Sequence, residues 1–181
     1  MNLYLAGPFF NPRQKEAAEL VASLAKAAGW DFYAPVLNAY QGKIDDSCKA
    51  RKVFLDNVAR LGWADIVLAH LDWLTPTSLE VRVVSRAKEE PENSELFRAV
   101  SNPLNVPDAG TVWELGYAFC RKQAGVRPFT LIGYTFMPGF ELNLMLSRSL
   151  DGFLRGSSQV KEFLKTGNLS ESQKKYAGEE I

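Results

Sequence analysis

The stretch Asp65-Ile66-Val67-Leu68-Ala69-His70-Leu71 is the strongest strand signal in the chain, and it decides the fold class. Its apolar residues are not interrupted by polar ones, which is typical of a strand buried on both faces of a parallel sheet. Residues 49–61, just before it, are predicted to form a helix that leads into this strand. The apolar residues of that helix available to pack inward are Val53, Leu55, Val58 and Leu61.

Strand and helix segments alternate on both sides of this central strand. The other predicted strands are Leu3–Ala6, Asp31–Pro35, Pro128–Tyr134 and Gly152–Leu154, and the other predicted helices are 12–28, 111–123, 141–149 and 158–165. This alternation predicts an α/β fold with a five-stranded parallel sheet, flavodoxin-like or Rossmann-like, with helices on both faces. In such folds ligands bind beyond the carboxyl ends of the strands, which directs attention to the residues just after each strand.

The chain of 181 residues is long enough for one domain with a sizeable core. We expect a single domain over residues 1–166, interrupted at 73–106 by a charged insertion that contains several prolines. Insertions of that length are usually functional or disordered. The last residues, 167–181, are polar and are expected to form a frayed tail.

Charge and composition argue against several functional classes. Lysine plus arginine and aspartate plus glutamate each number 21, and the basic residues are scattered, which argues against binding to nucleic acid or to an acidic membrane. The amino terminus lacks the pattern of a secretory signal, and no apolar run approaches the ~20 residues of a membrane span. Cys48, Cys120 and His70 are too scattered for a zinc site. We therefore expect a cytoplasmic protein with reduced thiols and no metal.

The first candidate site is Pro107-Asp108-Ala109-Gly110-Thr111-Val112-Trp113-Glu114-Leu115-Gly116-Tyr117. One interpretation is structural: Thr111 and Glu114 have the spacing of a capping box, and Asp108 fits an Asx turn. The other is chemical, because a carboxylate near a helix N-terminus is stabilised as an anion. An ionised Glu114 is suited to attack the anomeric carbon of a sugar, with Asp108 binding a sugar hydroxyl. The spacing alone leaves both interpretations open.

The second candidate is the opening segment Tyr4-Leu5-Ala6-Gly7-Pro8-Phe9-Phe10-Asn11, where the first predicted strand ends in a turn. Gly7 permits a close backbone approach to a ligand, and Phe9 and Phe10 offer flat faces on which a planar base can stack. The alternative is that the phenylalanines belong to the core, which we expect for at least one of them. Tyr4 lies inside the strand, so its hydroxyl needs a structural or catalytic partner.

Two further segments carry polar residues whose default roles are structural. Asn143 lies in an amphipathic segment, 140–147, in which it is a cap or a surface residue. Asp56 and Asn57 lie on the helix that leads into the central strand, where a solvated face is the default. None of the candidate segments is decisive alone, whereas their order and combination are specific.

Together these segments resemble the nucleoside 2-deoxyribosyltransferase family. The matching runs, in chain order, are Tyr4–Asn11, Asn57-Val58 with Ala64–Val67, Asp108–Thr111 with Trp113–Ala118, and Asn143–Met145. The resemblance covers most of residues 2–165 apart from the insertion. It implies a transferase that exchanges the base of a 2'-deoxynucleoside without a metal or an organic cofactor, and that assembles as a homo-oligomer.

The resemblance also implies roles for individual residues. Glu114 is the expected nucleophile, Asp108 contacts the sugar and orients Glu114, and Tyr4 hydrogen-bonds the Glu114 carboxylate. Asn143 is expected to reach the sugar's 5'-hydroxyl in the site of a neighbouring subunit. The other residues expected to bind substrate are Gly7, Phe9, Phe10, Asp56, Asn57 and Met145.

At one position the chain departs from the family pattern. Where some members have an aspartate facing the base, this chain has Asn57, with Asp56 one residue earlier. An asparagine can hydrogen-bond a base but cannot protonate it. Base selection is therefore expected to differ from that of the best-known members, and the group that protonates the leaving base is left open.

Two alternative functions stay open. A hydrolase of the same superfamily would transfer the sugar to water; one specific for 5'-monophosphates should have serines and an arginine around the first glycine turn, where this chain has Pro8-Phe9-Phe10 and only Arg13 nearby. A nucleoside-binding module would keep the fold without turnover, and the retained Glu114 and Asp108 argue against it. The expected partners are 2'-deoxynucleosides and free nucleobases, with no nucleic acid and no membrane.

Overall fold

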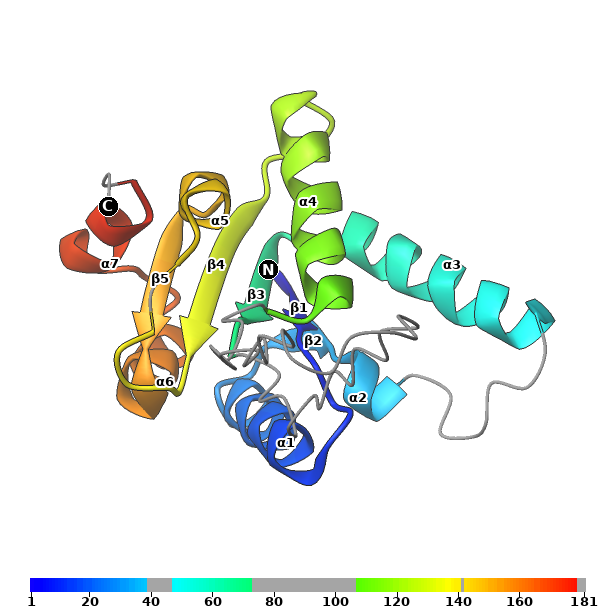
Figure 1. The fold of residues 1–181 in the computed structure, drawn as a ribbon, viewed down its shortest axis with the longest axis horizontal. Helices are drawn as coiled ribbons and strands as arrows, with labels where there is room; N and C mark the ends of the chain where they lie inside the picture. The colour runs from blue at the N-terminus through cyan, green and yellow to red at the C-terminus, as the bar shows by residue number, and fades with distance from the viewer. Residues whose placement is uncertain (39–46, 73–106, 141, 179–181) are drawn as a thin grey trace, which may run out of the picture.

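The computed structural model describes residues 1–38, 47–72, 107–140 and 142–178. Its sheet consists of five parallel strands: β1 (Asn2–Ala6), β2 (Asp31–Tyr33), β3 (Ile66–His70), β4 (Thr130–Thr135) and β5 (Gly152–Arg155). They lie in the order β2-β1-β3-β4-β5, with β3 at the centre (Figure 1). This is the strand order of flavodoxin. The predicted α/β fold is therefore confirmed, and of its two variants the flavodoxin-like one is observed.

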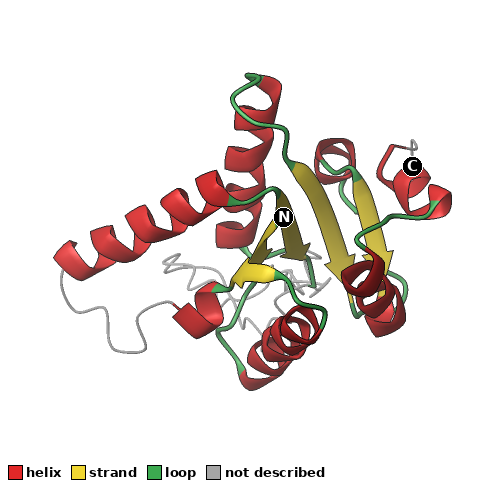
Figure 2. Cartoon of the chain, turned by 180° about the vertical axis from the view of Figure 1, so that it is seen from behind, coloured by secondary structure: helices red, strands yellow, loops and turns green. Residues whose placement is uncertain are grey.

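The helices form two layers, one on each face of the sheet. They are α1 (Pro12–Ala27), α2 (Pro35–Asn38), α3 (Ser47–Trp63), α4 (Ala109–Gln123), α5 (Leu144–Ser149), α6 (Gly156–Thr166) and α7 (Glu171–Gly178). On one face Leu3 and Leu5 of β1 pack with residues of α1 and α6, which lie side by side (Figure 2). On the other face Tyr4 and Ala6 pack with α3 and α4. Successive side chains of a strand point to opposite faces, so each strand contributes to both cores.

The boundaries of α1 follow from local chemistry. The Asn11 side chain accepts a hydrogen bond from the Gln14 N–H at 3.0 Å and so caps the helix, and Pro12 occupies the first turn, where a missing N–H is tolerated. Beyond the helix, Gly29 adopts a φ of 79°, a left-handed conformation that suits glycine. The chain then enters β2, which ends at Tyr33, and Pro35 begins α2 instead of extending the strand as predicted.

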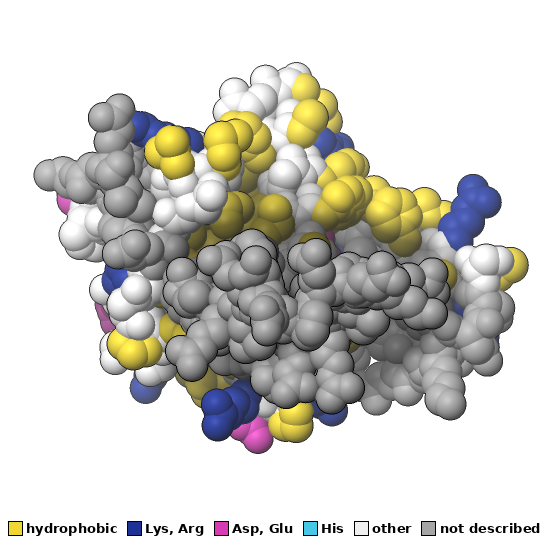
Figure 3. Space-filling view, in the orientation of Figure 1, with side chains coloured by type: hydrophobic (Ala, Val, Ile, Leu, Met, Phe, Trp, Pro, Cys, Tyr) yellow, Lys and Arg dark blue, Asp and Glu magenta, His cyan; other side chains and the backbone are white. Residues whose placement is uncertain are grey.

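The packing predicted for α3 is only partly confirmed. Of its four inward-facing candidates Leu61 is buried and Val53 and Val58 are partly buried, whereas Leu55 is 50% exposed, as is the neighbouring Phe54 at 51%. The physical reason is that α3 runs away from the sheet beside α4, so its first turns have no described layer beneath them (Figure 1). Hydrophobic side chains consequently lie on the surface along α3 and α4 (Figure 3).

The end of the chain is more ordered than the predicted frayed tail. Residues 171–178 form α7, which packs against α5 and β5. Leu169, just before this helix, lies over Gly152, where a Cβ atom would clash with the leucine side chain. The predicted insertion, 73–106, lies outside the described residues.

None of the described helices combines the length and the apolar character needed to span a membrane. Cys48 and Cys120 are both free and exposed.

Two glycines provide a matched test of the packing. A Cβ at Gly133 in β4 would lie 2.8–2.9 Å from the side chains of Leu150, Leu71 and Phe153, so Gly133→Ala is expected to destabilise the fold by about 1–3 kcal/mol through overpacking. A Cβ at Gly116 in α4 would meet nothing within 4 Å. Gly116→Ala is therefore expected to stabilise by about 0.5–1 kcal/mol, because alanine favours helix. Urea unfolding of both variants measures the two changes, and equal midpoints would contradict this packing.

Candidate active site

The candidate site is built around a contact between β1 and α4. Tyr4 is fully buried on the face of the sheet that α4 covers. Its hydroxyl donates a hydrogen bond of 2.6 Å to Oε1 of Glu114, which lies half-buried in α4. Burial, and next the negative charge of Glu114, raise the pKa of Tyr4 far above its ordinary value, so the phenol keeps the proton it donates. The hydrogen bond that the family resemblance implies is therefore present.

Asp108, and not Thr111, caps the N-terminus of α4. Its Oδ2 accepts hydrogen bonds from the Thr111 backbone N–H at 2.8 Å and from Thr111 Oγ1 at 3.0 Å. The predicted capping box is wrong, because Glu114 lies in the second turn and its carboxyl contacts Tyr4 instead of the helix end. Gly110 helps to make this possible, since a Cβ there would lie 3.0 Å from the Asp108 carboxylate.

The surroundings of Glu114 disfavour its charge. Burial raises the pKa of this carboxyl from 4.5 to about 7; the hydrogen bond from Tyr4 opposes the rise, and the charge of Asp108 adds to it. The expectation that the helix N-terminus stabilises the Glu114 anion is wrong, because α4 begins at Ala109 and the dipole acts mainly within the first turn. Among the described residues no lysine or arginine forms an ion pair with Glu114. The Tyr4 hydroxyl is thus the group that favours the ionised form.

A second tyrosine extends the site toward α3. Tyr33 of β2 is paired in register with Tyr4, and the two rings lie 5.6 Å apart at an angle of 30°. The Tyr33 hydroxyl donates a 3.0 Å hydrogen bond to Oδ1 of Asn57. Burial, and then the charge of Asp56, raise the pKa of Tyr33, and the charge of Glu114 adds to the effect. Asp56 and Glu114 therefore both lie near enough to Tyr33 for their charges to act on its hydroxyl, and the charge of Arg60 opposes them.

An open pocket of 550 Å³ lies against Tyr33, beneath α3. Its lining residues are Tyr33, Asn38, Asp56, Ala59, Arg60 and Trp63. Pockets that bind small ligands typically measure about 300–1,000 Å³. The pocket is therefore large enough for a nucleobase, and it adjoins Glu114 through Tyr33.

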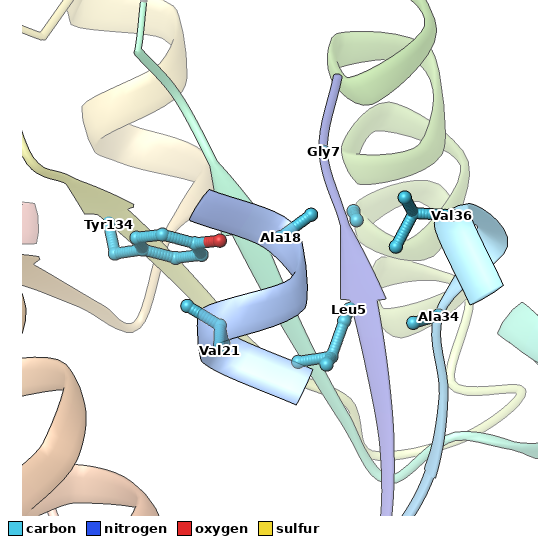
Figure 4. Close-up of a pocket in the computed structure, with 8 residues that line it drawn as sticks. Leu5, Gly7, Ala18, Val21, Ala34, Val36 and Tyr134 are labelled. Atoms are coloured by element: carbon cyan, nitrogen blue, oxygen red, sulfur yellow. The ribbon is translucent and has the colours of Figure 1, made fainter. Parts of the chain in front are cut away.

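A second hollow, on the opposite face of the sheet, is too small to bind a sugar. It measures 10 Å³, which is about the room that one water molecule needs. Figure 4 shows Leu5 of β1, Val21 of α1 and Tyr134 of β4 around it. This hollow is a packing gap between the sheet and α1.

The turn after β1 differs from expectation in two respects. A Cβ at Gly7 would lie 2.9 Å from the Cβ of His70, so the glycine makes room for the adjacent strand β3. The expectation that at least one of Phe9 and Phe10 lies in the core is wrong: they are 37% and 71% exposed, and their rings stack on each other. No described contact joins them to Glu114, and their role against a base stays a prediction.

The predicted residues of α5 lie apart from the Tyr4–Glu114 contact. The Asn143 side chain caps α5 by accepting a 2.8 Å hydrogen bond from the Met145 N–H, and both residues are exposed. Among the described contacts none connects them to Glu114. The cap or surface role considered for Asn143 is therefore present, and its role in a neighbouring subunit stays a prediction.

Sequence reasoning did not identify Tyr33, Arg60 or Trp63 as site residues. A usable signal existed for two of them. Tyr33 ends the strand predicted to lie beside the first one, and Arg60 follows Asp56 by four residues in a predicted helix, which places both side chains on one helix face. Only the tertiary fold brings Tyr33 beside Tyr4 and Arg60 against the rings of Tyr33 and Trp63.

The arrangement combines a nucleophilic group with a binding pocket. The Glu114 carboxyl, when ionised, has the chemistry of a nucleophile toward a sugar carbon. Tyr4 holds it in one orientation, while Asp108 contributes a second carboxylate whose Oδ1 accepts no hydrogen bond from the described residues. The pocket beside Tyr33 supplies the space for a planar group.

We expect Tyr4→Phe to raise the pKa of Glu114 above about 7, because the lost hydrogen bond favours the ionised form. The carboxylate is the form present above the pKa, so the variant would need a higher pH to ionise Glu114. A ¹³C NMR titration of labelled glutamate carboxyls measures the shift, with Glu114→Gln assigning the resonance. The matched control is Tyr117→Phe, which removes a hydroxyl that accepts from Arg121 instead of contacting Glu114. An unchanged or lower pKa in Tyr4→Phe would contradict this account.

The comparisons with known proteins bear on the family and on the fold of this chain. A sequence model of the family described as nucleoside 2-deoxyribosyltransferase matches residues 3–79. No curated protein sequence matches the chain significantly. Among solved structures, a 2-deoxyribosyltransferase from the psychrotolerant bacterium Bacillus psychrosaccharolyticus is similar with a TM-score of 0.62 and 18% identity, over 95% of this chain and 94% of that one. A conserved protein from Enterococcus faecalis V583 has a TM-score of 0.62 and 15% identity, over 93% of this chain and 99% of that one.

At sequence identities of 15–18%, the likeness to these two solved structures shows the fold alone. The sequence match covers the part of the chain that carries Tyr4, Tyr33 and Asn57. Sequence over residues 3–79 and fold over nearly the whole chain together support the nucleoside 2-deoxyribosyltransferase family for this protein.

Proposed function

We propose that this protein is a nucleoside 2'-deoxyribosyltransferase that exchanges the base of 2'-deoxynucleosides through a covalent deoxyribosyl-Glu114 intermediate. The observation that carries the proposal is the half-buried Glu114 carboxyl, held by the buried Tyr4 beside an open pocket. A carboxylate held in this way suits retaining glycosyl transfer, in which it forms and then releases a glycosyl ester. The proposed reaction needs neither a metal nor an organic cofactor.

In the first half-reaction an oxygen of ionised Glu114 attacks C1' of the deoxyribose. The C1'–N bond breaks, its electron pair leaves with the base, and the base takes up a proton. The transition state has oxocarbenium character, and its positive charge beside Glu114 favours the carboxylate form. Tyr4 keeps the carboxylate in line, and Asp108 is proposed to bind a sugar hydroxyl.

In the second half-reaction a nitrogen of an incoming base attacks C1', the ester bond from C1' to Glu114 breaks, Glu114 leaves as a carboxylate, and the attacking nitrogen loses its proton to solvent. A new nucleoside forms with the same configuration at C1'. Water in place of the base would give free deoxyribose. A ribonucleoside would bring a 2'-hydroxyl against Glu114, so the proposed enzyme discriminates against ribose.

The test is incubation of the protein with thymidine and free hypoxanthine, followed by chromatography. We expect deoxyinosine to appear, and Glu114→Gln to lower its formation by more than about 1,000-fold, because removal of a nucleophile abolishes the covalent route. Intact-protein mass spectrometry of the wild type should show one added deoxyribosyl group. The matched control is Glu16→Gln, which changes an exposed glutamate of α1 and is expected to leave the rate unchanged.

The products distinguish the alternative functions. Free deoxyribose without deoxyinosine would identify a hydrolase. No turnover in the wild type, with nucleoside affinity equal to that of Glu114→Gln, would identify a binding module. Equal rates on a ribonucleoside would contradict the proposed role of the 2'-position.

We further propose that the enzyme is a homo-oligomer in which Asn143 of one copy completes the site of another. Asn143 and Met145 are exposed and lie apart from the Glu114 contact in their own chain. Exposed apolar side chains on α3 and α4, including Phe54 at 51% and Trp113 at 46%, support burial against a second copy. Their rings contact each other, 5.4 Å apart, and form a continuous aromatic surface.

Mixing two inactive variants tests this assembly. Asn143→Ser retains a side chain that can cap α5 but shortens its reach, and Glu114→Gln lacks the nucleophile. Co-expressed, the two variants are expected to regain part of the base-exchange activity, because hybrids contain one intact combination of Glu114 and Asn143. Co-expression of Glu114→Gln with Glu114→Ala, the control, should regain none. A monomeric mass in solution together with no recovery would overturn the proposal.

A further inference from the structure

The pocket beneath α3 carries two opposite charges one helical turn apart. Asp56 and Arg60 both line it, and residues four apart lie on the same helix face with Cβ atoms about 5–6 Å from each other. Within the described part of the chain no ion pair joins them or involves either of them. The pocket therefore presents a hydrogen-bond acceptor and a set of donors side by side, each available to a ligand.

Aromatic rings hold the Arg60 guanidinium in place. Its Cζ lies 5.3 Å from the centroid of the Tyr33 ring and 5.6 Å from that of Trp63. Cation–π contacts of this kind orient a guanidinium without using its N–H groups. The planar donor fork of Arg60 is thus positioned but not occupied by a described carboxylate, which is what bidentate recognition of a ligand edge requires.

The pocket and Glu114 are connected through Tyr33 and Tyr4. Tyr33 lines the pocket, and its ring lies tilted against that of Tyr4, whose hydroxyl donates a hydrogen bond to Glu114. The Tyr33 ring is thus both a wall of the pocket and the direct neighbour of the ring that holds Glu114. The proposal places the base of a nucleoside bound at Glu114 in this space.

We propose that Arg60 and Asp56 read the edge of the base and select bases that carry a carbonyl next to a ring N–H. The proposal rests on the proposed function, and the preferred substrates are then nucleosides of oxo bases, such as hypoxanthine, guanine, thymine and uracil. Arg60 donates to the carbonyl oxygen, as arginine does to O6 of guanine. Asp56 accepts a hydrogen bond from the neighbouring ring N–H. An ionised carboxylate can only accept hydrogen bonds, so it cannot donate one to a ring nitrogen that lacks hydrogen.

Amino bases present the opposite pattern. Adenine and cytosine carry an amino group where the oxo bases carry a carbonyl, next to a ring nitrogen without hydrogen. In this pocket the amino group would face Arg60 donors, and the bare nitrogen would face the Asp56 carboxylate. Asp56 and Arg60 are both exposed, so the discrimination comes from the lost hydrogen bonds and from the mismatch of donor with donor and acceptor with acceptor.

Two matched pairs of nucleosides test the inference: deoxyinosine against deoxyadenosine, and deoxyuridine against deoxycytidine. Wild-type kcat/KM is expected to favour the oxo member of each pair by at least about tenfold, which corresponds to one good base contact. Arg60→Ala should remove most of this preference by slowing the oxo members alone. Arg60→Lys should restore only part of it, because a lysine keeps the charge but not the planar fork.

The control is Arg51→Ala, which removes an exposed arginine of α3 that does not line the pocket. It is expected to leave both preferences unchanged. Equal wild-type rates within each pair, or an equal loss for both members in Arg60→Ala, would overturn the inference. The second outcome would mean that Arg60 supports the pocket structurally.

Equilibrium binding of free hypoxanthine and free adenine separates this inference from the proposed function. Tighter binding of hypoxanthine, weakened in Arg60→Ala, supports base reading even if no base exchange occurs. Base exchange without any preference in rate or binding would leave the transferase proposal intact and refute the role of Arg60. Calorimetric titration measures both affinities without turnover.

Discussion

The hydrogen bond between Tyr4 and Glu114 is the interaction on which the site depends. It joins the first strand to α4 across 110 residues of chain and is made by a tyrosine with no exposed surface. A buried phenol must find a partner, because an unmade hydrogen bond in the core costs about 1–3 kcal/mol. Glu114 accepts this hydrogen bond, and the contact holds its carboxyl in a half-buried position. The same contact thus stabilises the fold and keeps a carboxyl in an environment that shifts its ionisation toward neutral pH.

The capping of α4 by Asp108 also determines the environment of Glu114. Asp108 takes over the helix N-terminus, so Glu114 is not needed there and lies one turn further along. Its charge is then disfavoured by burial and by Asp108, and favoured by Tyr4. A carboxyl balanced in this way gains most when positive charge develops beside it, as in the transition state of glycosyl transfer. The raised pKa is therefore consistent with a nucleophile that ionises fully as the reaction proceeds.

Apolar side chains of α3 and α4 lie exposed on the surface of the single chain. α3 has 17 residues but buries only Leu61, and Phe54 and Trp113 are about half exposed while packed on each other. A helix of marginal intrinsic stability ordinarily needs a packed apolar face. The unpacked turns of α3 and the exposed α5 are the features that connect the single chain to the proposed assembly, while the carboxyl-terminal turns of α3 supply the pocket beside Tyr33.

Much of the fold was predictable from the sequence, because the buried strand at 65–71, the alternation of strands and helices and the caps at Asn11 and Gly29 are local signals. The candidate carboxylates and Tyr4 were identified by order along the chain and by family resemblance. The sequence did not predict which residue caps α4, because Asp108 and Thr111 both have suitable side chains. Nor did the sequence predict that α3 extends beyond the sheet, because the apolar periodicity of a helix does not indicate which element packs against its apolar face. Tyr33, Arg60 and Trp63 became candidate site residues only in the tertiary structure, because the parallel register of β1 and β2 places Tyr33 beside Tyr4 and the packing of α3 places Arg60 over the rings of Tyr33 and Trp63. Local chemistry thus determined the elements, and the long-range packing of those elements decided the site.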